Sequence, residues 1–459
     1  MRTSKAGILI TLLTGLLFNN LLAQNNLAGL LQRGISNYPG IKARSSESES
    51  TLREVAAAKL EYMPKISLQH QYTYATSNSL AGSFYPNPAV ISPSGSIRNG
   101  NIDQAAWGSY TSALVEWNVF NFGKVSGNVR ASQKLNDASS ANLESVIFQH
   151  KVIISDVYLL TLMHQRLTFL QGVNLQRANA FLDVVRAGVK AGIRPGTDSS
   201  LASAEAAKAK ILLLQAEGEY QTQSLRLKEL SGIGAHEAIY IDSTFLTVIP
   251  PRLDTGYWNS QLNPLLRYYR LKTEASQARS IATKRSYLPA ITLVGAAWAR
   301  GSGISADDSY QSGFSSGTKY QVHNYLLGIS TRWTISDFAA TRQRYKSEYY
   351  MAVQDQELLN EQDLRIKRLI NESEMQYQIS IEQIKTAPVQ WQAAHDAYRQ
   401  AFARYESGLT DLPTFMQSIV TLNRAEADMA IGYVNVWRSV LAIAAAKGDF
   451  SIFMNAVTR

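Results

Sequence analysis

The stretch YMPKISL at residues 62–68 decides the fold, and it returns 225 residues later as YLPAITL at residues 287–293. In both copies a helical pattern reaches a Tyr-x-Pro sequence. Proline lacks a backbone N–H and disfavours the helical conformation in the residue before it, so we expect the helix to end there. Apolar and polar side chains then alternate, which predicts a strand with one apolar face. The chain therefore makes the same helix-to-strand transition twice.

Two further segments repeat in the same order. WNVFNFG at 117–123 is matched by WTISDFA at 333–339, and the turn Gly192-Ile193 is matched by Gly408-Leu409, both 216 residues apart. Matches in a fixed order indicate tandem copies of one unit, and a loop can absorb the difference between the two spacings. We expect a first repeat at 24–232, a proline-containing linker at 233–262 and a second repeat at 263–459.

Each repeat is predicted to contain a β-hairpin followed by a long antiparallel helical hairpin. The first helix of each helical hairpin extends over about 67 residues, far above the average of about 11 to 12. Apolar residues spaced three and four apart, among them Val157 and Leu160, predict coiled-coil seams. Pro388 lies within the second long helix and predicts a bend or a break there. The expected strands are 65–76 and 106–120 in the first repeat and 290–300 and 321–335 in the second, and the helical hairpins are 124–232 and 340–448.

The strands have the length and pattern of membrane-spanning β-strands. They hold about ten residues, one face is apolar and the other polar, and Trp and Tyr lie near their ends, as in the aromatic girdles of barrels. A mean hydropathy of −0.15 argues against several helical spans, whereas alternating strands barely change this quantity. Because even a filled barrel needs about eight strands, the four strands of one chain must be shared with other chains. A homotrimer would supply a barrel of 12 strands.

Composition excludes several kinds of site. The 459 residues include no Cys, which excludes a disulfide scaffold, thiolate metal sites, a cysteine nucleophile and a lipid anchor on an N-terminal Cys. The six His show no metal-ligand spacing, and neither a glycine-rich phosphate loop nor a Ser-His-Asp catalytic context occurs. We therefore expect no enzyme activity, no cofactor and no metal. The 45 Lys and Arg against 36 Asp and Glu are dispersed, which argues against nucleic acid as a partner.

The first 23 residues have the pattern of a signal peptide. Arg2 and Lys5 precede a mostly apolar stretch at 6–17, and Ala23 offers a small residue for cleavage. We expect cleavage after Ala23 and export of the mature chain. Its formal net charge would then be +7, because the whole chain has +9 and the signal peptide removes two basic residues.

In this order of elements the chain resembles the TolC-type outer membrane efflux proteins, also called outer membrane factors. The resemblance rests on the doubled pattern, which includes the Phe-rich turn VFNFGK at 119–124, and it covers essentially the whole mature chain. It implies an α+β membrane protein in which a homotrimer forms a 12-stranded β-barrel in outer-membrane lipid and an α-helical barrel in the periplasm. It further implies a passive exit duct of a tripartite efflux pump or a type I secretion system. In that family a periplasmic adaptor protein and an inner-membrane transporter open the periplasmic end.

The resemblance also assigns roles at the tips of the helical hairpins. Gly192, Ile193, Gly408 and Leu409 match the turns that contact the adaptor, although helix termination by glycine explains the two Gly equally well. Thr197, Asp198 and Tyr405 match residues that close the periplasmic mouth in the family. For Asp198 we also expect a role as N-cap of the following helix, which is compatible with the first role.

The chain departs from the family pattern just after the second tip. Thr414 and Gln417 occupy two positions at which TolC carries inward-facing acids, Asp411 is the nearest acid, and Thr410 replaces the basic partner. A ring of carboxylates in a narrow pore attracts cations, so its absence removes the basis for strong cation selectivity. The gate must then rely on other contacts, and the candidates are Arg194, Arg404 and Glu406.

Two other functions share parts of this architecture. A periplasmic coiled-coil adaptor also has long helical hairpins, but it needs lipoyl-like half-motifs on both sides of one hairpin, whereas here each of two helical hairpins follows a β-hairpin. A structural envelope protein without transport activity could have the same architecture as a channel. Conductance in a planar bilayer and the oligomeric state distinguish these alternatives from a trimeric channel.

Overall fold

A computed structural model describes residues 26–79, 97, 99–239, 242–251 and 258–458. The predicted signal peptide at 1–23 lies outside the described residues, as do parts of the expected linker at 233–262 and of the loop after the first strand. The chain forms two compact units. One contains residues 52–134 and 275–352 and holds the strands, and the other contains 1–51, 135–274 and 353–459 and is helical.

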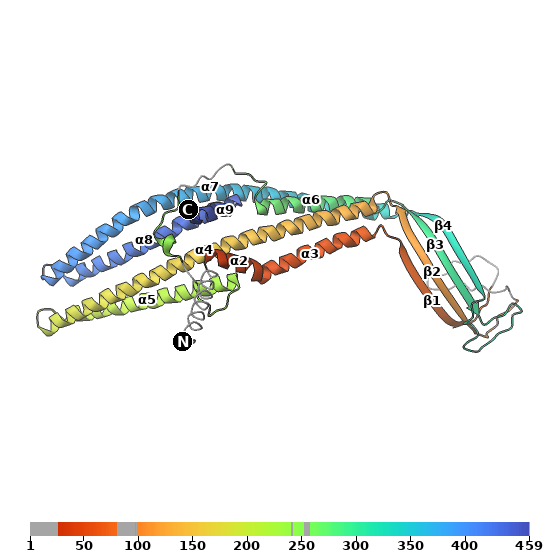
Figure 1. The fold of residues 1–459 in the computed structure, drawn as a ribbon, viewed down its shortest axis with the longest axis horizontal. Coiled ribbons are helices and arrows are strands. Elements are labelled where there is room, and N and C mark those ends of the chain that lie inside the picture. Colours follow the sequence, from red (N-terminus) through yellow and green to blue (C-terminus); the bar gives the residue numbers. More distant parts are fainter. Residues whose placement is uncertain (1–25, 80–96, 98, 240–241, 252–257, 459) are drawn as a thin grey trace, which may run out of the picture. The chain divides into compact units, whose positions relative to one another are not determined.

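The sheet has four antiparallel strands in the order β1-β2-β3-β4 (Figure 1). Each β-hairpin expected from the sequence is present, and the pairing of β2 with β3 joins the two hairpins into one sheet. The strands are β1 (Lys65–Ala75), β2 (Ala106–Phe120), β3 (Ala290–Ser302) and β4 (Val322–Arg332). One edge of β1 and one edge of β4 have no strand partner in the described part of the chain.

A helix precedes or follows every strand, as the two sequence repeats require. α3 (Pro39–Leu60) leads into β1 through Pro64, and α6 (Pro264–Arg285) leads into β3 through Pro289. The long helices α4 (Lys124–Lys190) and α7 (Asp337–Glu406) follow β2 and β4, and α5 (Gly196–Ser231) and α8 (Leu412–Lys447) return from them. The remaining short elements are α2 (Leu27–Asn37), the 3₁₀ helix η1 (Ser243–Leu246) and α9 (Ser451–Thr458). The mostly helical chain with one small antiparallel sheet confirms the expected α+β class.

The two return helices end against the residues just before α3 and α6. A Cβ added to Gly232, just after α5, would lie 2.9 Å from the Cβ of Asn37, and one added to Gly448, just after α8, would lie 2.8 Å from the Cα of Asn263. Real Cβ atoms do not approach other atoms this closely, so both positions need glycine. The same close contact at equivalent places in both repeats supports the tandem arrangement.

The main core of the helical unit lies where α2, α4, α8, η1 and α9 meet. Tyr158 of α4, Phe245 of η1 and Trp437 of α8 form an edge-to-face aromatic stack with centroid distances of 5.9 and 4.9 Å. Their polar groups are satisfied, because the Tyr158 hydroxyl accepts from the Asp242 N–H at 2.9 Å and the Trp437 Nε1 donates to the Val248 carbonyl at 3.0 Å. The segment after α5 is thereby fixed to the long helices.

The sequence predicts a bend or a break at Pro388. α7 continues through this residue as one helix, so the helix does not break there. Proline at this position removes the hydrogen bond that residue 388 would donate to the Ile384 carbonyl. Ile384 and Ala387 are buried against the rest of the helical unit, and Pro388 itself is exposed. Packing of the adjacent apolar residues therefore outweighs the local loss at the proline.

Among the described residues, α4 and α8 each contain a stretch apolar enough to cross a membrane by length and composition. In α8 the stretch is 56% buried inside the protein, and α8 contributes residues such as Val434, Trp437 and Val440 to the core described above. Such burial is typical of a core helix in a helical domain.

Candidate functional site

The two hairpin tips share one backbone geometry. Gly192 follows α4 with φ of +73° and Gly408 follows α7 with φ of +72°, values that favour glycine. The Ile193 N–H donates to the Gly188 carbonyl at 3.0 Å, and the Leu409 N–H donates to the Arg404 carbonyl at 2.8 Å, which is the Schellman pattern of helix termination. The side chains of Ile193 and Leu409 are 77% and 69% exposed. Each tip therefore presents one apolar side chain to solvent.

An aromatic cluster packs the two helical hairpins together next to the tips. Phe181 of α4 lies 5.3 Å from Tyr405 of α7 and 4.5 Å from Phe415 of α8, measured between ring centroids. Tyr405 and Phe415 stack at 5.6 Å and are 1% and 0% exposed. Ala202, Ala206 and Ala209 of α5 belong to the same cluster, and their small size allows close helix packing. Of these three aromatic residues only Tyr405 was a candidate from the sequence, and Phe181 and Phe415 were not.

Arg194, in the first tip, binds the end of the helix that leads to the second tip. Its Nη2 donates to the main-chain carbonyl of Tyr405, and its guanidinium carbon lies 4.0 Å from the centroid of the Tyr405 ring. The last carbonyls of a helix have no partner within the helix and carry the negative end of its dipole. The Tyr405 carbonyl also accepts from the Gly408 N–H at 3.0 Å, so Arg194 adds a second, charged hydrogen bond to this helix end and makes a cation–π contact with the Tyr405 side chain. Both contacts join the first helical hairpin to the second.

The expectation that Asp198 caps α5 is wrong. The N-cap is Pro195, α5 begins at Gly196, and no side chain accepts a capping hydrogen bond at this end. Pro195 is extended at ψ of 146°, so the helix starts directly after it and Asp198 becomes its third residue. Asp198 is half-buried near Tyr405, whereas Thr197 is exposed.

Asp198 and Arg194 both influence the Tyr405 hydroxyl. Burial raises the pKa of Tyr405, Asp198 adds to the rise, and Arg194 opposes it. Within the described structure the buried hydroxyl has no hydrogen-bond partner with acceptable geometry. Tyr405 is thus held by its ring and its carbonyl.

The residues after the second tip lie on an exposed face of α8. Asp411 is the N-cap, and its carboxylate accepts from the Thr414 N–H at 3.2 Å. Hydrogen bonds from the Thr414 side chain and backbone hold the pKa of Asp411 below its usual range. Thr414 and Gln417 are both exposed. The nearest acid to the two uncharged positions is therefore engaged in capping its own helix.

Polar contacts between α4 and α8 continue away from the tips. Arg177 forms an ion pair with Glu426, and each of these side chains is only 16% exposed. Farther along, the Arg438 Nε donates to Asp156 at 2.7 Å. Neither pair is predictable from the sequence, because the partners lie 249 and 282 residues apart and no local spacing marks them.

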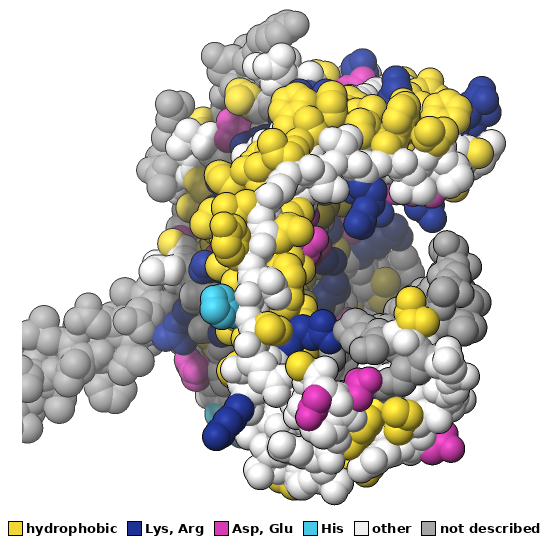
Figure 2. All heavy atoms as spheres, turned by 90° about the vertical axis from the view of Figure 1, so that its right-hand side faces the viewer, with side chains coloured by type: hydrophobic (Ala, Val, Ile, Leu, Met, Phe, Trp, Pro, Cys, Tyr) yellow, Lys and Arg dark blue, Asp and Glu magenta, His cyan; other side chains and the backbone are white. Residues whose placement is uncertain are grey.

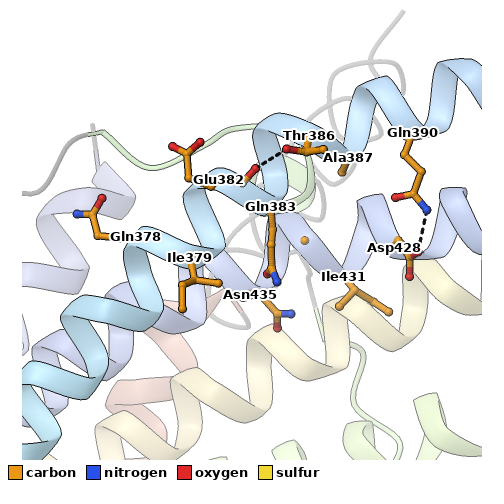
Figure 3. Close-up of a pocket in the computed structure, with 11 residues that line it drawn as sticks. Gln378, Ile379, Glu382, Gln383, Thr386, Ala387, Gln390, Asp428, Ile431 and Asn435 are labelled. Carbon is orange, nitrogen blue, oxygen red and sulfur yellow. Dashed lines mark hydrogen bonds between the residues drawn. The ribbon is translucent and has the colours of Figure 1, made fainter.

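A shallow groove between α7 and α8 has a polar lining (Figure 3). Gln390 donates to Asp428 at 3.2 Å across it, and Gln383 and Asn435 point toward one another from the two helices. Gly432 of α8 allows close approach, since an added Cβ would lie 3.1 Å from the Ile384 side chain. Among the described residues no group of three or more His, Asp or Glu could hold a metal ion. The groove offers hydrogen-bonding side chains from both helices.

The strand register separates the sheet into an apolar and a polar face. Ile66 pairs with Val115, Leu68 with Ala113, and Leu293 with Ile329, so these side chains share one face. This face is open to solvent in the single chain: Leu68, Leu327 and Tyr325 are 80%, 82% and 82% exposed. Figure 2 shows hydrophobic side chains gathered on the outer side of the curved surface at this end of the chain. Such a wide exposed apolar surface marks an interaction with lipid or protein.

Aromatic side chains bound the apolar face at both ends. At one end Trp107 contacts Tyr72, Tyr74 and Phe314 with centroid distances of 5.0, 4.8 and 4.9 Å. At the other end the Trp117 Nε1 donates to the Tyr62 carbonyl at 2.8 Å. From Trp107 to Trp117 the strand rises about 33 Å at about 3.3 Å per residue, which gives about 25 Å of height at a tilt of about 40°. That height matches the apolar band of a membrane β-barrel.

The alternation in the sequence does not predict one detail of the pairing between β2 and β3. Pairing between β2 and β3 shifts between Asn118 and Phe120, so Phe120 lies opposite Ile291 on the apolar face. An extra residue in one strand of an antiparallel pair is a β-bulge, and strict alternation of the sequence cannot reveal it. Phe120 then packs edge-to-face on Phe122 at 4.6 Å and extends the aromatic end of the sheet.

Comparisons with known proteins agree with this geometry. Residues 30–233 match the family model described as outer membrane efflux protein. A search of curated proteins finds no significant match. Among solved structures the chain is similar to the outer membrane protein VceC from Vibrio cholerae, with 16% identity, coverage of 92% of this chain and 96% of that chain, and a TM-score of 0.70.

Two further solved channels have the same fold. The Campylobacter jejuni outer membrane channel CmeC shares 13% identity over 92% of this chain and 85% of that chain, with a TM-score of 0.76. The Neisseria gonorrhoeae outer membrane channel MtrE, in its open state, shares 13% identity over 93% of this chain and 89% of that chain, with a TM-score of 0.67. Residues 30–233 thus match the outer membrane efflux protein family model, and the chain has the fold of solved outer membrane channels.

Proposed function

We propose that this protein is the outer-membrane exit duct of a tripartite efflux pump or a type I secretion system. Three copies would join their sheets into a 12-stranded barrel in outer-membrane lipid, and their helices would form a tunnel in the periplasm. The duct is passive, and a periplasmic adaptor with an inner-membrane transporter opens it. The family match over residues 30–233 supports this class of function.

The structure of the sheet is the main support for the proposed trimeric barrel. It has one apolar face of membrane height and two strand edges without partners in the described chain. Unpaired N–H and C=O groups at a sheet edge are costly in lipid, where no water can satisfy them. Joining β4 of one copy to β1 of the next satisfies both edges, and closure of the ring leaves none.

In the helical unit, Arg194, Asp198 and Tyr405 form the proposed gate. They link the first hairpin to the second within one copy, so a partner that separates the hairpins must break the Arg194 contacts. The exposed tip residues Ile193 and Leu409 would contact that partner, with Gly192 and Gly408 setting their positions. Thr197, Asp411, Thr414 and Gln417 would line the mouth around this contact.

The absence of cysteine permits a direct test of the shared barrel. Pairs of single Cys placed on β1 and β4, such as Gln71→Cys with Asn324→Cys, and their neighbours along each strand, should form disulfides between copies and give a trimer on a non-reducing gel. The control is Gln69→Cys with Ser112→Cys, which are register partners within one chain and should give a monomer. A panel that yields no cross-linked trimer would contradict the proposed barrel.

Conductance tests transport itself. Purified protein in planar bilayers should give discrete current steps, whereas an adaptor or a structural envelope protein would give none. The adaptor alternative has no specific support among the observations, because both helical hairpins follow strands of one sheet.

A further inference from the structure

We propose that the barrel part of the duct prefers anionic solutes, a selectivity that rests on the proposed channel function. The inference comes from the polar face of the sheet, which would line the lumen. All four strands are described over their full length, so the charges that they carry can be assigned to a face.

Every charged side chain of the four strands lies on the polar face. The register places Lys65, Glu116, Arg300 and Arg332 on the side opposite Ile66, Val115 and Ile329. Placing an ion on the lipid side would be costly, so this distribution identifies the polar face as the water-filled side. Three of the four charges are basic.

The single acid on the strands has a basic residue directly opposite. Glu116 pairs with Lys65 across β1 and β2, and side chains directly opposite one another lie close enough to interact. The residues opposite Arg300 in the register are Tyr110 and Val322, and the residue opposite Arg332 is Ala290. The strands of one chain therefore contribute a net charge of +2, concentrated on β3 and β4.

The surrounding unit has the same sign. Residues 52–134 and 275–352 contain 16 Lys and Arg against 8 Asp and Glu. The other unit, without the predicted signal peptide, contains 27 Lys and Arg against 28 Asp and Glu. The positive charge of the mature chain is thus confined to the unit that holds the sheet.

A charge of one sign on the wall of a narrow water-filled passage raises the local concentration of counter-ions, since the low-dielectric wall focuses the field. Three copies would place six Arg side chains of β3 and β4 around the lumen. At the proposed mouth Thr414 and Gln417 are uncharged, and the carboxylate of Asp411 is engaged in capping α8. The preferred solute is therefore a small or amphipathic anion.

The test is the reversal potential of single channels in planar bilayers, with KCl at tenfold different concentrations and below about 0.1 M so that screening stays weak. The wild-type protein should show a reversal potential of the sign that chloride preference produces. The double variant Arg300→Gln/Arg332→Gln should move it toward zero or past it, whereas Arg300→Lys/Arg332→Lys, which keeps both charges, should not. Glu116→Gln should move it in the opposite direction and strengthen the preference for chloride.

The outcomes separate this inference from the proposed function. A channel that conducts but prefers potassium, or one whose reversal potential ignores both the Arg and the Glu116 substitutions, overturns the selectivity and leaves the duct intact. The absence of any conductance overturns the duct and the selectivity together. Because the wild-type sign and the Glu116→Gln shift are measured independently of the Arg variants, poor folding of the double Gln variant does not remove the test.

Discussion

Arg194 donates a hydrogen bond to the main-chain carbonyl of Tyr405 and lies over the Tyr405 ring, although the two residues are 211 positions apart in the chain. One is in the first hairpin tip and the other ends the helix before the second tip. The family resemblance places a basic partner after the second tip, at Thr410. In this protein the cation comes instead from the opposite hairpin and binds a helix end, so the contact does not depend on a paired carboxylate.

Replacing Arg194 should loosen the proposed gate. Arg194→Gln loses the charged hydrogen bond and the cation–π contact, and a hydrogen bond to a charged group contributes about 1.5 to 3 kcal/mol. We expect an increase of about tenfold or more in the open probability of single channels, since about 1.4 kcal/mol corresponds to tenfold. Arg194→Lys should lie between the two, because lysine lacks the planar guanidinium.

Bilayer recordings at one voltage and one salt concentration measure this change. Arg186→Gln, on α4 before the same tip, is the control, because no contact between Arg186 and the second hairpin is present in the described structure. An open probability of Arg194→Gln equal to that of the control would contradict the role of Arg194.

Tyr405 should act through its ring and carbonyl. Tyr405→Phe keeps both and removes a buried hydroxyl that has no hydrogen-bond partner, so stability and open probability should stay near wild type. Tyr405→Ala should destabilise the tip by about 3 to 5 kcal/mol, because it leaves a cavity among Phe181 and Phe415. Thermal unfolding followed by circular dichroism, together with conductance, measures both effects.

Asp198→Ala tests whether Asp198 acts on the gate through the Tyr405 hydroxyl. If Asp198 holds the gate through the Tyr405 hydroxyl, then Asp198→Ala and Tyr405→Phe should raise conductance equally. The geometry predicts that Tyr405→Phe has little effect. A large effect of Tyr405→Phe would show that the hydroxyl is bonded in the working channel.

An acidic ring added at the mouth should change ion preference. Thr414→Asp/Gln417→Asp restores carboxylates at two exposed positions of α8, and three copies would bring six negative charges to a narrow passage. We expect the reversal potential in a KCl gradient to shift toward potassium preference. Thr414→Asn/Gln417→Asn has nearly the same shape without charge and should leave the preference as in wild type; if it shifts as far, shape and not charge controls the mouth.

The sequence predicts the regular parts of this fold well because local chemistry determines them. Tyr-x-Pro sequences end α3 and α6, alternation marks the strands, and Gly192 and Gly408 end the long helices with positive φ. The same local rules do not predict which residue near the start of a helix becomes its N-cap. Of two Asp residues near helix starts, Asp411 caps α8, whereas Asp198 does not cap α5, because Pro195 starts that helix earlier.

Contacts between the two repeats cannot be predicted from the sequence. The pairing of β2 with β3, the Arg177–Glu426 ion pair and the Arg194–Tyr405 contact each join segments more than a hundred residues apart. A single sequence contains no spacing that links such positions. The apolar face, in contrast, was visible, because its register follows from period-two alternation, and only the bulge at Asn118–Phe120 interrupts it.

Acid should destabilise the main helical core through His150. This side chain is 4% exposed, stacks on Tyr38 at 4.2 Å and donates through Nε2 to the Leu230 carbonyl at 2.9 Å. Burial lowers the pKa of His150, and the carbonyl only partly offsets this. The unfolded chain therefore binds a proton near pH 6.5, whereas the folded side chain binds it at lower pH. Stability is complete above about pH 6.5 and falls as the pH drops toward the folded pKa.

His150→Gln keeps a hydrogen-bond donor without a titrating group. Unfolding temperatures measured by circular dichroism between pH 7.5 and 5.5 should fall less in this variant than in wild type. Burial lowers the pKa of His164 as well, so His164→Gln should reduce the slope independently. An unchanged slope in the double variant would show that other groups cause the acid sensitivity.

Replacing Pro388 by alanine should make the protein more stable. α7 stays helical through Pro388, whose exposed ring leaves the Ile384 carbonyl without its usual donor. Pro388→Ala restores this donor and should stabilise the helix by up to about 3 kcal/mol, measured as a higher unfolding temperature. Val389→Ala, at the next exposed position, is the control and should change the unfolding temperature little. If Pro388→Ala lowers conductance and leaves stability unchanged, the proline is needed for the curvature of the duct. If Pro388→Ala raises stability and leaves conductance unchanged, the proline has no role in transport, and the packing of Ile384 and Ala387 compensates for its cost.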